Sequence, residues 1–282
     1  MPNVPDPNYD YAIERLVDAY KAAVGDILVE LRGLDVTDSS RANSAAALAE
    51  VARILTQLND ESARWCEEFI PQAARDGVIR AIVSLGGGIT VAEAETIAKF
   101  NRMNANMAAA AVADTQADLL AVTQNVDRKV RAAVRNVVGQ SMRANMAAGI
   151  NGRRTIARDV LDGMRRTLGD VVSSGIIDAR GRRWRPEVYA DMITRTKLML
   201  THMEATANEA IARGALFGVI SRHNATDACA KYEGKIVKLT PEADGDYPYV
   251  GDLRASGAIF HPNCKHVVSP IRDPRKYEGG TI

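Results

Sequence analysis

The sequence predicts a mainly α-helical protein, with a long helical N-terminal region and a small, loop-rich α+β module at the C-terminus. Aromatic residues supply only 5% of the chain and alanine is abundant, which favours closely packed helices over a sheet-rich core. No proline occurs between Pro71 and Pro186, as expected for long helices. Five of the ten prolines follow residue 240, so the loop-rich part is expected there.

We expect three segments along the chain. Residues 1–170 form a helical domain, residues 171–222 a linking helix and strand, and residues 223–282 a small module that contains cysteine and histidine. A chain of 282 residues with 46% hydrophobic content can bury a sizeable core. A module of roughly 60 residues buries much less apolar surface, so a bound metal is one candidate stabiliser of it.

The first helices are predicted from apolar residues spaced three and four positions apart. In residues 8–34 this stripe comprises Ile13, Leu16, Val17, Tyr20, Ala23 and Val24. In residues 45–70 it comprises Leu48, Val51, Ile54, Leu55 and Leu58. Trp65, Cys66 and Phe69 extend the second stripe, and we interpret Cys66 as a small buried hydrophobic residue.

The glycines of "LGGGITVAEAETIAKF", residues 85–100, precede a helix, as they do in a phosphate-binding loop. The Lys-Ser/Thr pair of such a loop is missing and no buried strand comes before the glycines, so this class of site is excluded. The glycines are expected to end one helix. Thr90 and Glu93 then have the spacing of a capping box at the start of the next.

The net charge of +1 hides an uneven distribution. Residues 1–100 hold 9 Lys and Arg against 16 Asp and Glu, whereas residues 128–185 hold 14 against 4. This asymmetry indicates either a surface that meets a polyanion or an acidic protein, or simply a solvated helical face. The arginines expected to face a polyanion are Arg128, Arg131, Arg135, Arg153 and Arg154. No aromatic residues are interleaved for base stacking, so a contact with DNA would be non-specific.

The C-terminal third contains a further helix and two short strands. Pro186 suits the first turn of a helix, which is expected to end near Gly214. Residues 216–221 form a short apolar run and residues 234–239 alternate between apolar and polar, and both patterns are typical of strands.

Several features of the sequence indicate the cellular compartment in which the protein folds. The N-terminus lacks the basic start and apolar core of a secretory signal, and the apolar run at 107–113 is far shorter than the roughly 20 residues of a membrane span. Three scattered cysteines do not make a disulfide framework. We therefore expect a protein that folds in a reducing cytoplasm and has no membrane partner.

Residues with metal-binding chemistry gather in "IFHPNCKHVVSP", residues 259–270. Zn²⁺ takes tetrahedral Cys and His ligands, so Cys229, Cys264, His266 and His261 are the candidate ligands of a structural zinc. The usual CxxC pair is absent. The alternative is a hydrogen-bonded turn in which the side chains of His261 and Asn263 link backbone segments and Cys264 is buried.

Two catalytic interpretations lack support in the residues. A Cys264 nucleophile would need a helix or glycine context that lowers its thiol pKa. A metal-dependent nuclease would need a further spaced histidine and a base that activates water. We therefore expect no enzymatic activity.

Three blocks of sequence follow one another along the C-terminal part: "GRRWRPEVYADMITRT" (181–196), "VISRHNATDACAKYEGKIVKL" (219–239) and "SGAIFHPNCKHVVSP" (256–270). In this order they resemble the phage minor capsid protein family, of the minor capsid protein 2 type, which is related to the Mu F-like head morphogenesis proteins. The resemblance extends over residues 170–273, and the helices before residue 110 do not contribute to it.

The resemblance implies a structural minor capsid or head morphogenesis protein of a tailed bacteriophage, present in few copies at the portal vertex. It implies the portal protein or the major capsid protein as partners, and a location in the virion head after assembly in the host cytoplasm. Packaged DNA is a further expected partner of the basic segment. The alternative function is a DNA-binding or DNA-processing accessory protein of genome packaging.

Many members of the family carry a CxxC pair before the Gly-Lys element. Counted back from Gly234, Cys229 matches the second cysteine, whereas Thr226 stands at the first. Asp227, next to Thr226, carries a carboxylate instead of a thiol and stands one position away from that of the first cysteine. A four-ligand zinc site would therefore need His223 or His261 in place of the missing thiolate. Some relatives carry a toxin-like domain after this module. The chain stops soon after the motif, so that activity is not expected.

Overall fold

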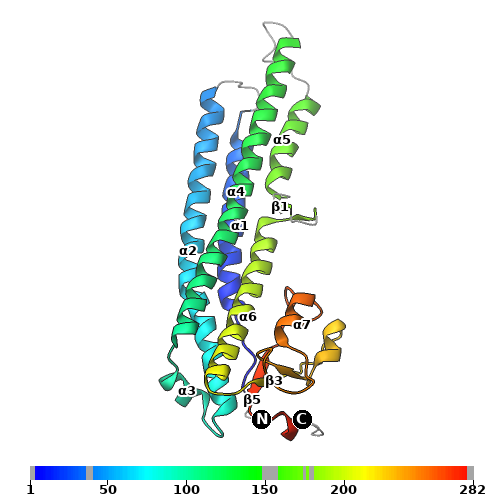
Figure 1. Cartoon of the computed structure of the whole chain (residues 1–282). Helices are drawn as coiled ribbons and strands as arrows, with labels where there is room; N and C mark the ends of the chain where they lie inside the picture. Colours follow the sequence, from blue (N-terminus) through cyan, green and yellow to red (C-terminus); the bar gives the residue numbers. More distant parts are fainter. Residues whose placement is uncertain (1–3, 36–40, 148–157, 174–175, 178–180, 278–282) are drawn as a thin grey trace. The chain divides into compact units, whose positions relative to one another are not determined.

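The structure, a computed structural model, describes residues 4–35, 41–147, 158–173, 176–177 and 181–277. Within these residues it contains seven α-helices and five short strands, which Figure 1 labels in chain order. The prediction of a mainly α protein with a small sheet near the C-terminus is confirmed. None of the described helices combines the length and the apolar character that a membrane crossing requires.

The helices differ greatly in length. They are α1 (Asp10–Gly33), α2 (Arg41–Leu85), α3 (Val91–Ile97), α4 (Arg102–Ala147), α5 (Arg158–Ser173), α6 (Pro186–Ala212) and α7 (Val250–Ser256). The chain forms two compact units, each assembled from separate stretches. Unit 1 comprises Met1–Tyr11, Trp65–Thr115 and Met192–Ile282, and unit 2 comprises Ala12–Arg64 and Gln116–Asp191.

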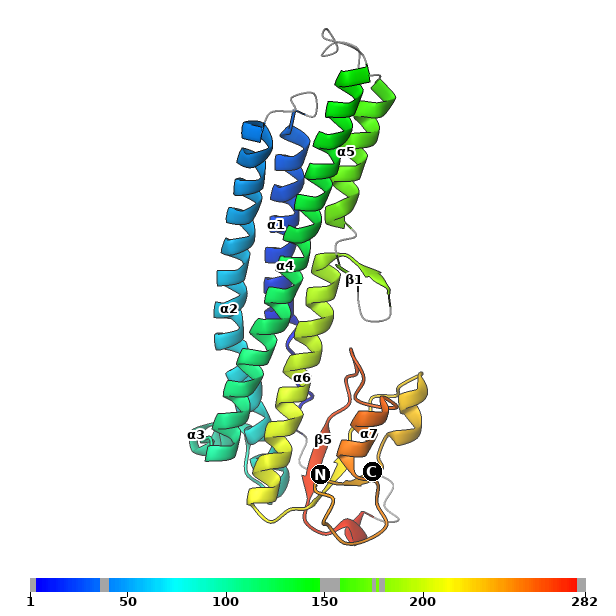
Figure 2. The same ribbon diagram turned by 45° about the horizontal axis from the view of Figure 1, so that its top comes forward.

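Unit 2 is a bundle built from α1, α5 and parts of α2 and α4, which run side by side in Figures 1 and 2. The predicted stripe of α1 faces its core: Ile13, Leu16, Tyr20 and Ala23 are buried. The Tyr20 hydroxyl donates to the carbonyl of Leu119 at 3.3 Å, which ties α1 to α4. Apolar residues at helical spacing therefore form the core that the sequence predicts.

Helix α2 continues through Pro71, whereas the apolar stripe predicted from the sequence extended only to residue 70. A proline inside a helix removes one hydrogen bond and costs about 3 kcal/mol. Ile70, Ala73 and Ala74 beside it are each fully buried. The packing of this helix face offsets the local cost of the proline, which sequence periodicity alone did not reveal.

The start of α3 matches its prediction closely. The Thr90 side chain accepts the Glu93 backbone N–H at 3.3 Å, and the Glu93 carboxylate accepts the Thr90 N–H at 2.8 Å. This is the capping box that the spacing predicts. Gly87 and Gly88, with φ of 63° and 130°, form the preceding turn and require glycine for that reason.

Unit 1 contains a three-stranded antiparallel sheet in the order β4, β3, β5. The two predicted strands are β3 (Phe217–Ile220) and β4 (Ile236–Lys238), and β5 (Val268–Ile271) completes the sheet on the other edge of β3. Gly218 is at the centre, where an added Cβ would lie 2.4 Å from Val268. Close packing of the central strand therefore requires a glycine. A separate pair, β1 (Ile176–Ile177) and β2 (Arg183–Trp184), precedes α6.

Candidate metal centre

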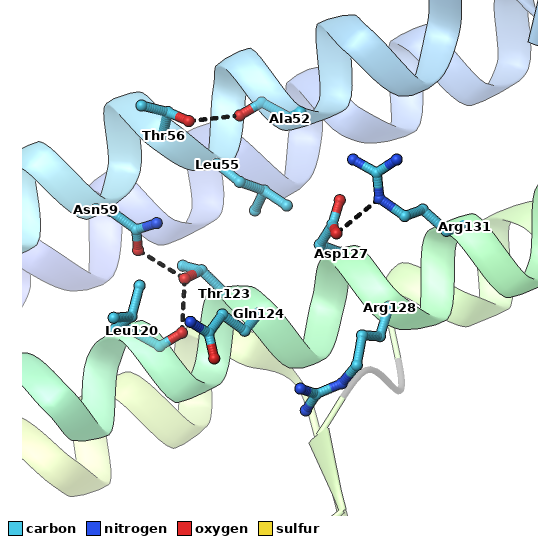
Figure 3. A pocket seen from close by; sticks show the side chains of 10 residues that line it. All are labelled: Ala52, Leu55, Thr56, Asn59, Leu120, Thr123, Gln124, Asp127, Arg128 and Arg131. Carbon is cyan, nitrogen blue, oxygen red and sulfur yellow. Dashed lines mark hydrogen bonds and ion pairs between the residues drawn. The ribbon is translucent and has the colours of Figure 1, made fainter. Parts of the chain in front are cut away.

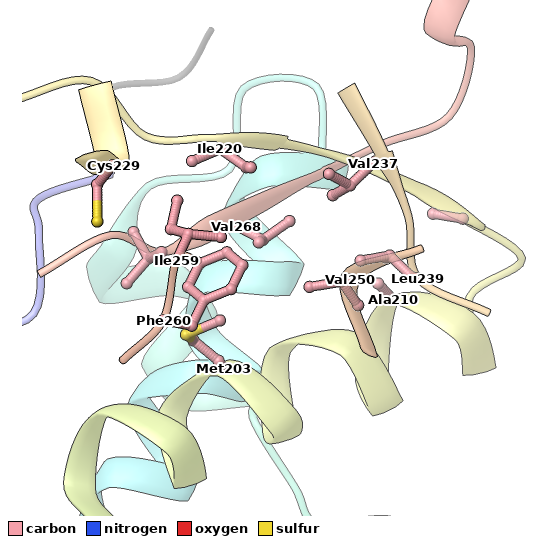
Figure 4. Packing of buried hydrophobic residues seen from close by; sticks show 12 residues of the cluster. Met203, Ala210, Ile220, Cys229, Val237, Leu239, Val250, Ile259, Phe260 and Val268 are labelled. Carbon is pink, nitrogen blue, oxygen red and sulfur yellow. The ribbon is translucent and has the colours of Figure 1, made fainter. Parts of the chain in front are cut away.

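Cys229 enters the site from a 3-10 helix, η2 (Ala228–Tyr232), which lies between β3 and β4 in the chain. The Asp227 carboxylate accepts the Cys229 backbone N–H at 2.9 Å and so caps this helix. Cys229 is 1% exposed and borders the apolar cluster of the C-terminal module shown in Figure 4. A short capped helix thus holds the thiol at the edge of the core.

His261 and Cys264 come from the turn that follows α7. The Cys264 backbone N–H donates to the His261 carbonyl at 2.9 Å and closes the turn. His261 Nε2 lies 3.1 Å from the sulfur of Cys229, and the sulfur of Cys264 lies 4.0 Å from that same sulfur. The three side chains each place one ligand atom within 4.8 Å of the other two.

His266, which is 2% exposed, stands between Cys264 and Glu233. Its Nδ1 lies 3.3 Å from the Cys264 sulfur, and its Nε2 lies 3.2 Å from Oε1 of Glu233. That oxygen also accepts the backbone N–H groups of His223 and Ala225, both at 3.0 Å. Three of the four ligand candidates from the sequence therefore form one group of close ligand atoms, and His266 adjoins that group through Cys264, with Glu233 on its other side.

The turn that carries His261 has an unusual backbone. Phe260 and Asn263 adopt φ of 58° and 66°, in the left-handed region. For a bulky residue such as Phe260 this conformation costs on the order of 1–3 kcal/mol and persists only where the surroundings impose it. Phe260 is 6% exposed and packs in the apolar cluster of Figure 4. Its burial holds the turn in the shape that directs His261 and Cys264 toward Cys229.

The pKa values in the cluster follow from these contacts. Backbone N–H groups of Ala225 and His223 lower the pKa of Glu233 to about 2, so this carboxylate is ionised. Burial, and then the neighbouring His223, lower the pKa of His266. Burial, and then the neighbouring Cys264, raise the pKa of Cys229 to about 12. At neutral pH the cluster therefore offers a neutral imidazole at His266 and a thiol that loses its proton only when a cation replaces it.

The hollow beside the cluster is small. It is lined in part by His261, Cys264, His266 and Met203, and its volume is about 10 Å³. This is space for a single water-sized particle. The arrangement can hold an ion and is too small for an organic substrate.

A second group of close ligand atoms in the described part of the chain consists of His223, Glu233 and His266. The His223 ring packs against the His266 ring, with centroids 4.0 Å apart and planes tilted by 43°. Its Nδ1 is buried and has no hydrogen-bond partner among the described residues. Sequence reasoning did not single out Glu233, because one carboxylate in a hairpin carries no periodic or spacing signal.

The predicted polyanion-facing arginines are on α4 where the structure describes them. Arg128 and Arg135 are exposed, and Arg131 donates to Asp127 at 2.7 Å. Figure 3 shows Arg131 paired with Asp127 at a hollow between α2 and α4, which Arg128 also lines. The remaining two, Arg153 and Arg154, lie outside the described residues.

Comparison with known proteins identifies one family. The sequence model described as Phage minor capsid protein 2 matches residues 6–272, nearly the whole chain. The match includes the helices before residue 110, which the motif blocks do not reach. No curated protein and no solved structure matches the chain.

Proposed function

The chain belongs to the phage minor capsid protein 2 family, and we propose that it is a structural component of the portal vertex in the head of a tailed phage. Membership of this family implies a location in the virion and other head proteins as partners. The family match over residues 6–272 is the observation that carries the proposal. The hollow beside the Cys/His cluster, about 10 Å³ in volume, is too small for an organic substrate, which supports a structural role over a catalytic one.

Unit 1 has an apolar corner between α3 and α4 that suits a contact with the portal protein. Ile97, Phe100 and Met103 are 50%, 38% and 57% exposed there. Arg75 and Lys99 line the adjoining hollow, together with apolar side chains. Gathered apolar residues of this size often mark an interaction site, and the two cations favour a partner segment that is both apolar and acidic.

Quantitative mass spectrometry of purified virions tests the role as a head component. The protein should be present in few copies per head, and a density map of the vertex should place those copies at the portal. Virions without any copy would contradict the structural role. Copies distributed over the shell would contradict the portal location alone.

A substitution tests the contact surface. Phe100→Ser should lower the number of copies per virion, because it removes an exposed aromatic ring from the corner. Val29→Ser is the control, since Val29 is an apolar residue on α1 that is even more exposed, at 68%. Equal incorporation of the two variants would exclude the corner as the contact.

A non-specific contact with packaged DNA is the second function that an observation favours. Arg128 and Arg135 are exposed on α4, in the segment that holds 14 Lys and Arg against 4 acidic residues. DNA affinity should then fall steeply with salt, with a slope of about −0.9 per phosphate contact. The double variant Arg128→Ser and Arg135→Ser should reduce that slope, whereas Arg53→Ser should not. Absence of binding at low salt would remove this function.

A further inference from the structure

We propose that this protein binds one Zn²⁺ ion through the sulfurs of Cys229 and Cys264, Nε2 of His261 and Nδ1 of His266. The ion joins η2, the turn after α7 and the segment just before β5, and so closes the C-terminal module. The proposal is independent of the role at the portal vertex. Binding exchanges two thiol protons, one from each cysteine, for the metal and releases them to solvent.

The two histidines already have the tautomers that such a site needs. His261 Nδ1 lies 2.9 Å from the carbonyl of Pro262, which can only accept, so Nδ1 carries the proton and Nε2 keeps its lone pair. The ionised Glu233 carboxylate likewise places the proton of His266 on Nε2 and leaves Nδ1 free. Both free nitrogens face a cysteine sulfur. A carboxylate or carbonyl behind each histidine is the usual arrangement around a bound zinc.

Cys229, His261 and Cys264 are already spaced as ligands of one tetrahedral ion, whereas Nδ1 of His266 adjoins this group through Cys264 and moves toward the other two ligands when the ion binds. Metal bonds of about 2.3 Å to sulfur and 2.0 Å to nitrogen separate neighbouring ligand atoms by roughly 3.3–3.8 Å. The measured separations are 3.1 Å and 3.3 Å between sulfur and nitrogen and 4.0 Å between the sulfurs. The adjoining hollow of about 10 Å³ has room for an ion and little else. Two thiolates and two imidazoles favour Zn²⁺ over Mg²⁺ or Ca²⁺.

The fourth ligand is His266 in preference to two nearby candidates. Asp227 Oδ2 lies 3.8 Å from His261 Nε2, but its side chain is 59% exposed and its carboxylate already caps η2. His223 belongs to the other group of close ligand atoms, together with His266 and Glu233. Oε1 of Glu233 already accepts two backbone N–H groups, which makes that group a poorer ion site. With His266 as ligand, four protein atoms close the site. A closed set leaves no position for a reacting water, as in structural zinc sites.

Elemental analysis of the full chain, purified without a metal-affinity tag, should find close to one zinc per chain. Zinc removed with a chelator and replaced by Co²⁺ should give the intense visible bands of tetrahedral cobalt and a thiolate-to-cobalt charge-transfer band. Substoichiometric zinc in fresh protein would overturn the proposal. A weak octahedral cobalt spectrum without thiolate absorption would also overturn it, since it indicates surface binding only.

Variants define the ligand set. Cys229→Ala should abolish zinc binding, whereas Cys66→Ala, which removes an equally buried thiol elsewhere, should leave one zinc per chain. Glu233→Gln keeps the shape of the side chain and weakens its hydrogen bond to His266. It should lower zinc affinity about 10–100-fold in competition with a chromophoric chelator.

Two more substitutions separate the candidates for the fourth ligand. Asp227→Asn and His223→Gln should retain zinc, and His266→Gln should lose it. Loss of zinc in either of the first two variants, with retention in the third, would overturn the ligand set. If Cys229→Ala fails to fold, the cobalt spectrum of the unaltered chain and the affinity of Glu233→Gln still decide the proposal.

Discussion

Arg80 on α2 donates its Nε–H to Nε2 of His202 on α6 at 3.2 Å, inside unit 1. Because arginine only donates, Nε2 of His202 accepts and the ring proton lies on Nδ1. Nδ1 then donates to the Tyr9 hydroxyl at 2.9 Å, and Tyr9 donates to the carboxylate of Asp76. This directed chain of hydrogen bonds joins the N-terminal segment to two helices.

Acid should destabilise the fold through His202. Burial and the charge of Arg80 lower the pKa of His202 to about 3, well below the ordinary 6.5. Between these two pH values the unfolded chain binds a proton that the folded chain does not, so the free energy of unfolding falls as the pH falls. The expected loss approaches 1.4 kcal/mol per pH unit inside this window.

Urea unfolding at pH 6.0 and pH 4.5 measures this effect. His202→Gln can accept from Arg80 and donate to Tyr9 without titrating. Its free energy of unfolding should therefore decrease less between the two pH values than that of the unaltered chain. Equal decreases would show that His202 does not carry the acid sensitivity.

Removal of the Arg80 guanidinium should strongly destabilise the protein. Arg80 is 2% exposed and donates to Ser269 at 3.1 Å and to the Pro5 carbonyl at 2.6 Å, in addition to His202. Arg80→Met leaves these acceptors unpaired, and the expected loss is about 3 kcal/mol. Chemical denaturation measures it.

Arg53→Met provides the comparison for Arg80→Met. Arg53 is exposed and pairs with Glu50 one helical turn away. Such surface pairs contribute about 0–1 kcal/mol. Losses of similar size in the two arginine variants would mean that the buried hydrogen bonds contribute little.

Two glycine substitutions should have opposite effects. An added Cβ at Gly77 would lie 2.2 Å from the His202 carbonyl oxygen, so Gly77→Ala forces α2 and α6 apart within unit 1 and should cost about 3 kcal/mol. Gly25 on α1 has open space around it. Gly25→Ala should stabilise by about 0.5–1 kcal/mol, because alanine favours a helix interior. Thermal unfolding measures the change in stability of both variants. If Gly77→Ala left the stability unchanged, the close contact between α2 and α6 would be contradicted.

Metal removal should loosen the C-terminal module first. A structural zinc contributes on the order of 10 kcal/mol to the fold it closes. A chelator should therefore lower the melting temperature and open residues 223–277 to limited proteolysis, while α1 stays protected. Cys66→Ala should respond to the chelator like the unaltered chain. A digestion pattern that the chelator does not change would speak against a structural metal.

Local patterns predicted several of the helices and some of their ends. Thr90 and Glu93 are three residues apart, and Pro186 begins α6, so each signal is complete within a few positions of sequence. The strands β3 and β4 were predicted for the same reason. β5 was not, because Pro270 argues against a strand, and its partners on β3 are remote in sequence.

The sequence by itself determined the helical class, the position of the small module and the residue types that can bind a metal, since composition and short-range spacing encode these. Only the tertiary structure decided that Cys229 meets His261 and Cys264, which follow it by 32 and 35 residues, and that Glu233 orients His266. The path of the intervening chain sets such distances. Burial of Phe260 in the core then sets the shape of the turn. Neither the path of the chain nor this burial can be derived from the spacing of residues in the sequence.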